Sequence, residues 1–135
     1  MEEVRDILER TRTIAVLGAS ATPSRAGFYV GEYLQHAGYE VWPINPARVG
    51  QQIWGRPVYA SLADLPSPVD LIDVFRRPEQ LPAHVDQILA LSWKPDVVWF
   101  QLGIQHAPSA ARLRASGIAV VENRCTLADH RRLLG

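Results

Sequence analysis

The chain has 135 residues, 47% of them hydrophobic, and its formal net charge at pH 7 is zero. This length suits one domain with a substantial core and is too short for two, so we expect residues 1–135 to form a single domain. The balanced charge argues against a nucleic-acid-binding surface, because a basic stripe would unbalance it. No apolar run approaches the ~20 residues that a membrane span needs, so no membrane association is expected.

The N-terminal segment and the cysteine content bear on the cellular compartment. The segment is charged and lacks the apolar core of a secretory signal peptide. Cys125 is the only cysteine, which excludes an intrachain disulfide and is consistent with a reducing environment. We therefore expect a cytoplasmic protein.

Apolar patterns along the chain predict alternating helices and strands. Residues 2–10 have the spacing of a short amphipathic helix, and Ile14–Leu17 is a continuous apolar run that is typical of a buried parallel strand. A helix is predicted over 27–37, where Gly38 ends it, and a strand over 40–44. Further strands are predicted over 57–59, 69–75, 97–100 and 118–121, and further helices over 78–91, 108–116 and 127–134.

Six predicted strands alternate with helices, which is typical of an α/β protein with a mostly parallel sheet. We predict a single Rossmann-like doubly wound domain with strand order 3-2-1-4-5-6 and helices on both faces. Ligands of such sheets bind beyond the carboxyl ends of the strands, where the strand order reverses. Here that crevice is expected between the 14–17 strand and the 69–75 strand.

The first strand ends in a turn of small residues, Gly18-Ala19-Ser20, and a helix begins soon afterwards. Turn amides and a helix N-terminus together favour an anion. The dinucleotide pattern G-x-G-x-x-G would need glycine where Ser20 and Pro23 stand, and the Walker ending Gly-Lys-Ser/Thr is absent. The turn therefore predicts a phosphate-binding loop that is neither a dinucleotide-binding loop nor a Walker loop.

Small, amide and arginine side chains follow the predicted strands at this edge. Arginine presents a planar fork that suits phosphate, whereas Arg77 is expected to be solvated. Neither a carboxylate cluster nor a His-Cys grouping with metal spacing follows the strands, so no metal site is expected. The candidate ligand-binding residues are Gly18, Ala19, Ser20, Arg25, Asn45, Pro46, Phe75, Arg76, Gln101 and Gly103.

Five short motifs occur in order along the whole chain. They are Gly18-Ala-Ser20, Pro43-Ile-Asn45-Pro46, Asp73-Val-Phe-Arg76, Trp99-Phe-Gln101-Leu-Gly103 and Asn123-Arg-Cys125. Together they resemble those of the small stand-alone bacterial CoA-binding proteins. That family is similar to the N-terminal CoA-binding domain of the succinyl-CoA synthetase alpha subunit.

The resemblance implies that the chain binds coenzyme A (CoA) or an acyl-CoA. It places the backbone from Gly18 to Ser20 at the pyrophosphate and Arg25 near a phosphate. The chain contains neither the phosphohistidine domain nor the nucleotide-grasp domain of the synthetase, so a non-catalytic binding or regulatory module is implied rather than a ligase. The remaining assignments are Asn45 and Pro46 beside the adenosine part, Phe75 and Arg76 along the pantetheine or phosphate path, and Gln101 and Gly103 on the far wall.

Two other functions stay open on the sequence. An NAD(P)-dependent oxidoreductase would need a second glycine in the turn and an acidic residue where Asn45 stands. An acyl-CoA or redox sensor would act through a partner protein or through Cys125, whose thiol is reactive if Arg124 or a helix terminus lowers its pKa. A Cys125–His130 dyad would require the fold to bring the two together, and Trp54 is a candidate for stacking on a base.

Overall fold

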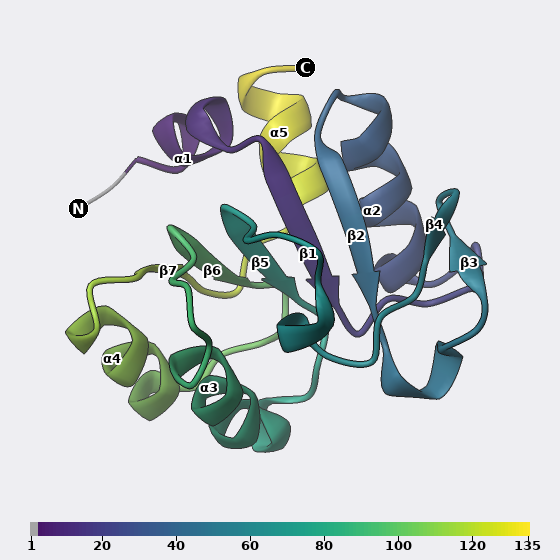
Figure 1. Ribbon diagram of the computed structural model, residues 1–135. Helices are drawn as coiled ribbons and strands as arrows, with labels where there is room; N and C mark the ends of the chain where they lie inside the picture. Colours follow the sequence, from purple (N-terminus) through teal and green to yellow (C-terminus); the bar gives the residue numbers. More distant parts are fainter. Residues whose placement is uncertain (1–2) are drawn as a thin grey trace.

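A five-stranded parallel sheet forms the centre of the computed structural model, which describes residues 3–135 (Figure 1). Its strand order is β2-β1-β5-β6-β7. All residues of β5 and β6 are buried, as expected for parallel strands that are covered on both faces. The strands are β1 (Thr13–Leu17), β2 (Glu40–Ile44), β5 (Leu71–Val74), β6 (Val97–Phe100) and β7 (Ala119–Val121).

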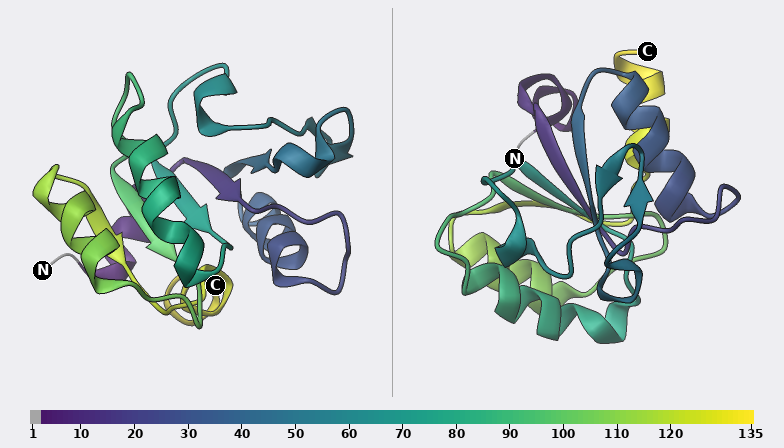
Figure 2. Two further views of the ribbon diagram at one scale, coloured as in Figure 1. Left: turned by 90° about the horizontal axis from the view of Figure 1, so that it is seen from below. Right: turned by 45° about the vertical axis from the view of Figure 1, so that its right-hand side comes forward.

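Helices cover both faces of the sheet, as the alternation of patterns predicted (Figures 1 and 2). On one face lie α1 (Val4–Arg10), α2 (Ala26–His36) and α5 (Thr126–Leu133), and on the other lie α3 (Leu81–Leu89) and α4 (Ala107–Ala115). Two apolar clusters fill the spaces between these layers. Three short 3-10 helices complete the fold: η1 (Pro46–Arg48), η2 (Leu62–Asp64) and η3 (Pro78–Gln80).

The predicted order 3-2-1-4-5-6 is wrong at its first position. Residues 57–59 form no full strand of the main sheet, which they join only through a bridge between Tyr59 and Ile44. Pro43 explains this. On the outer side of β2 its carbonyl accepts a hydrogen bond from the Tyr59 N–H. On that same side proline has no N–H to donate, so the pairing does not continue along the strand. The outer position is instead taken by a separate antiparallel hairpin of β3 (Gln52–Ile53) and β4 (Arg56–Pro57).

The helix predicted over 78–91 is divided into η3 and α3. Proline at the start of each segment suits a first helical turn, where an N–H has no intrahelical partner. The longest helix between residues 3 and 135 is α2, with 11 residues. Within that range no helix combines the length and apolar character that a membrane crossing requires.

Candidate functional site

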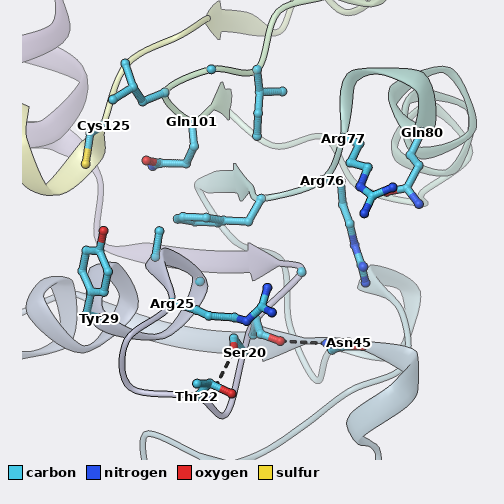
Figure 3. Close-up of a pocket in the computed structure, with 18 of the residues that line it drawn as sticks. Ser20, Thr22, Arg25, Tyr29, Asn45, Arg76, Arg77, Gln80, Gln101 and Cys125 are labelled. Carbon is cyan, nitrogen blue, oxygen red and sulfur yellow. Dashed lines mark hydrogen bonds between the residues drawn. The ribbon is translucent and has the colours of Figure 1, made fainter.

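A cavity of about 1110 Å³ opens at the carboxyl ends of β1, β2, β5 and β6 (Figure 3). The crevice rule for doubly wound sheets thus locates it correctly. Pro46 does not line this cavity; it is exposed at the start of η1. The other nine candidate residues do: Gly18, Ala19, Ser20, Arg25, Asn45, Phe75, Arg76, Gln101 and Gly103. Their contacts with a ligand stay predictions.

Several lining residues were not singled out as candidates from the sequence. Arg48 and Gln80 follow strand ends, as the chosen residues do, so the same rule extended by a few positions would have found them. Thr22 and Tyr29 come from the loop before α2 and from its first turns. The other lining residues are Ala26, Gly27, Arg77, Pro78, Leu102, Ile104 and Cys125.

The turn after β1 uses its amides inside the protein. The N–H groups of Gly18 and Ala19 both donate to the Ile44 carbonyl, and the Ser20 N–H donates to the Gly27 carbonyl. By contrast, no hydrogen bond joins the amides of Ala26 and Gly27 to another residue within 3–135. The amides available to an anion therefore belong to the N-terminus of α2.

Asn45 holds the turn in place, with one hydrogen bond at each end of its side-chain amide. Its Nδ2 donates to the Ala19 carbonyl at 2.8 Å, and its Oδ1 accepts from the Ala47 N–H at 2.9 Å, which caps η1. Figure 3 shows the first of these bonds beside the Arg25 side chain, which extends toward the middle of the cavity. One hydrogen of Nδ2 is left for a ligand in the cavity, which Asn45 lines.

The cavity concentrates positive charge in a chain whose net charge is zero. Its lining includes four arginines and no Asp or Glu. In the part of the chain that the structure describes, no carboxylate forms an ion pair with any of the four, whereas seven other arginines have such partners. A concave surface lined by one sign of charge attracts ligands of the opposite sign. The four are Arg25, Arg48, Arg76 and Arg77.

Arg76 carries a donor that the protein leaves unused. Its Nε is buried and has no hydrogen-bond partner among residues 3–135. A buried donor without a partner costs roughly 1–3 kcal/mol. The side chain lies against the turn, since a Cβ added at Gly18 would lie 3.2 Å from this Nε. An anion at the turn would give the atom a partner.

A buried carboxylate lies behind the cavity wall. Asp73 is fully buried and accepts hydrogen bonds from Gln101 Nε2 at 2.6 Å and from the Thr126 hydroxyl at 2.9 Å. Burial raises the pKa of Asp73 to about 7, although both hydrogen bonds lower it. In the sequence, Asp73 belongs to the Asp73-Val-Phe-Arg76 motif without an expected role, and Thr126 lies outside all five motifs.

Trp54 and His130, which the sequence left open, and His106 all have structural contacts outside the cavity. The Trp54 ring packs on α2 at Gly31 and donates to the Phe28 carbonyl, so it does not line the cavity. His106 caps α4 by accepting from the Ser109 amide. His130 Nδ1 is hydrogen-bonded to the Tyr33 hydroxyl at 2.8 Å, and within 3–135 no hydrogen bond joins this histidine to the Cys125 thiol.

A parallel α/β sheet with an arginine-lined cavity at its carboxyl edge defines a Rossmann-like domain of the kind that accommodates anionic ligands. The chain belongs to the CoA-binding domain family, whose sequence profile matches residues 12–131. This membership supports CoA binding in general terms.

Relatives of similar size cover almost the whole chain. The uncharacterized protein YneT of Bacillus subtilis is 34% identical over 128 residues, which are 95% of this chain and 92% of YneT. A solved Thermus thermophilus structure, cell-free ID.343, is 45% identical with a TM-score of 0.94, over 99% of this chain and 100% of that one.

The same fold also occurs within a larger enzyme. The dinucleotide-forming acetyl-coenzyme A synthetase 1 of Ca. Korarchaeum cryptofilum is 21% identical, with a TM-score of 0.70. The match covers 87% of this chain and 27% of the synthetase, so it shows a shared fold alone.

Proposed function

We propose that residues 1–135 act as a single module that binds CoA or an acyl-CoA in the cavity, without ligase chemistry of its own. The observation that carries the proposal is the charge of the cavity: four arginines and no carboxylate line it. CoA carries a pyrophosphate and a 3′-phosphate, so it is strongly anionic. Family membership supports this ligand over other nucleotides.

The donors around the β1 turn fit a pyrophosphate. The free amides of Ala26 and Gly27 lie at the N-terminus of α2, where the helix dipole also favours negative charge. Arg25 precedes them and forms no side-chain cap with the helix. The unpartnered Nε of Arg76 lies close to Gly18. These groups would hold the phosphates, while the turn amides support the loop from behind.

The binding test is isothermal titration of ligand-stripped protein with CoA, with NAD⁺ and NADP⁺ as parallel ligands. We expect CoA alone to bind, at micromolar concentration or tighter. Binding of a nicotinamide nucleotide in place of CoA would reject the proposal and favour an oxidoreductase. Parallel titrations with acetyl-CoA and longer acyl-CoAs would show whether an acyl group is preferred.

Arg25→Ala tests the charge argument without disturbing the core, because Arg25 is exposed. We expect CoA affinity to fall about tenfold, since the variant removes a charged donor to phosphate. The difference should shrink at about 1 M salt, where the Debye length is only ~3 Å.

Arg12→Ala is the matched control. It removes another exposed arginine, which lies directly before β1 at the amino ends of the strands and does not line the cavity. Its CoA affinity should equal that of the wild type. Equal losses in both variants would show that net charge, rather than the cavity, determines affinity.

A further inference from the structure

Gln101 connects the cavity to the buried carboxylate. Gln101 is 4% exposed and lines the cavity, whereas Asp73 and Thr126 are both 0% exposed. Gln101 Nε2 donates to Asp73 Oδ1 at 2.6 Å and to Thr126 Oγ1 at 2.7 Å, and the Thr126 hydroxyl donates to Asp73 Oδ2 at 2.9 Å. The three side chains form a closed ring of hydrogen bonds in the cavity wall.

This ring determines which end of the Gln101 amide is available to a ligand. An ionised carboxylate only accepts, so the amide nitrogen must face Asp73, and both of its hydrogens are used. The carbonyl oxygen Oε1 has no hydrogen-bond partner within residues 3–135 and is not among the buried unpartnered atoms. Figure 3 shows the Gln101 side chain reaching from the end of β6 into the cavity. Gln101 therefore offers an acceptor there and no donor.

We propose that Gln101 Oε1 accepts a hydrogen bond from an N–H or S–H group of the pantetheine arm, and that Asp73 is a positioning residue that keeps the amide in this orientation. The inference rests on the proposed function, because it takes CoA as the ligand. The pantetheine arm carries two amide N–H groups and, in free CoA, a terminal thiol. A thioester carbonyl in the same position would be an acceptor facing an acceptor.

Protonation of Asp73 removes this constraint. A neutral carboxyl group has its own O–H, which Gln101 Oε1 accepts once the amide turns over, and the nitrogen then faces the cavity. The raised pKa of Asp73 puts this change near neutral pH. CoA affinity should therefore rise as Asp73 ionises.

No neighbouring charge contributes to the shifted pKa of Asp73, although titratable groups occur elsewhere on its face of the sheet. The flanking strands β1 and β6 carry none, and the charged side chains of α1 are exposed. Burial and the two hydrogen bonds are the causes of the shifted Asp73 pKa, with no contribution from a neighbouring charge. The titratable or charged groups of the other segments on this face are Tyr29, Glu32, Tyr33 and His36 on α2, the buried Tyr39 before β2, and Arg124, Cys125, Asp129, His130, Arg131 and Arg132 at α5.

The experiment compares wild type, Asp73→Asn and Gln101→Met by isothermal titration from about pH 6 to about pH 8. The ligands are CoA, desulfo-CoA, which lacks the thiol, and adenosine 3′-phosphate 5′-diphosphate, which is the nucleotide half without the arm. The ratio of the variant Kd to the wild-type Kd at each pH cancels the ionisation of the ligand itself. It therefore isolates the protein group that titrates.

For CoA, we expect the Asp73→Asn ratio to be about one near pH 6 and to rise to about tenfold near pH 8, the effect of one hydrogen bond. Gln101→Met should weaken CoA about tenfold at the higher pH. Neither variant should change the affinity of the nucleotide half. If the wild type prefers CoA to desulfo-CoA and Gln101→Met removes that preference, the donor is the thiol. If the two ligands behave alike, the donor is an amide N–H.

Two results would overturn the inference while leaving CoA binding intact. One is an Asp73→Asn ratio for CoA that does not change with pH. The other is an equal loss of affinity for the nucleotide half, which would indicate general damage to the site. Failure of the wild type to bind CoA at any pH is a different result, because it would reject the proposed function itself.

Discussion

At the residue scale, Gly18 determines how closely two strand ends approach each other. Its φ is +94°, and an added Cβ would lie 2.7 Å from the Phe75 carbonyl oxygen. The backbone that such a side chain would meet belongs to the segment directly after β5, the strand that pairs with β1. A side chain at this position would therefore damage the fold as well as the cavity.

Gly18→Ala should lower the free energy of unfolding by roughly 2 kcal/mol or more, since strain at positive φ adds to a collision with backbone. Gly38→Ala is the matched control, because Gly38 has a φ of +110° with no atom within 4 Å of the added Cβ. Urea unfolding of both variants separates the cost of strain at positive φ from the cost of the collision with the Phe75 backbone. Equal losses would show that strain alone accounts for the requirement at Gly18.

At the element scale, α5 is attached to the sheet by a buried acidic residue. Asp129 is 6% exposed and accepts from Arg124 Nε at 2.7 Å and from its Nη2 at 2.9 Å. The Arg124 carbonyl in turn accepts from the Trp99 indole N–H at 2.7 Å. These contacts fix the start of α5, where Cys125 and Thr126 meet the cavity wall.

Asp129→Asn should destabilise the protein by about 2 kcal/mol, because it removes a two-pronged, charge-assisted contact and leaves the buried position poorly paired. Asp86→Asn is the surface comparison. Its partner Arg112 lies 2.7 Å away, but both side chains are largely exposed, at 67% and 46%. That loss should stay below ~1 kcal/mol. If thermal unfolding showed similar losses of stability in both variants, burial of Asp129 would add nothing to the strength of its contact with Arg124.

The elements that sequence predicted well are those whose own residues determine them. Continuous apolar runs gave β1 and β6, and helices lie within a few residues of their predicted bounds. The failures depend on contacts between distant segments. Proline at position 43 cannot donate a backbone hydrogen bond, but the effect of this on residues 57–59 depends on which side of β2 Pro43 faces. The hydrogen bond from the Gly18 N–H to the Ile44 carbonyl, which no sequence pattern indicates, also follows only from the position of β2 beside the turn.

At the scale of the whole molecule, Asp73 makes stability depend on pH. Because the folded-state pKa is raised from 3.8 to about 7, the folded protein binds this proton more tightly than the unfolded chain does. The resulting stabilisation is fully present below about pH 4 and is lost as pH rises to about 7. Over that range the loss is on the order of 4 kcal/mol. His84 and His130 act in the opposite direction, because burial lowers their pKa values and protonation favours unfolding.

Comparing Asp73→Asn with the wild type cancels the histidine contributions, since both proteins contain them. The stability of the variant relative to wild type should increase from about pH 4 to about pH 7 and then stay constant, which urea unfolding at each pH would show. A difference that does not vary with pH would mean that Asp73 titrates normally. As pH rises, the same substitution should gain stability relative to wild type and, if the positioning role holds, lose affinity for CoA. If Asp73 only supported the fold, the substitution would show the same stability trend with no pH-dependent loss of CoA affinity, so measuring both quantities distinguishes the two roles.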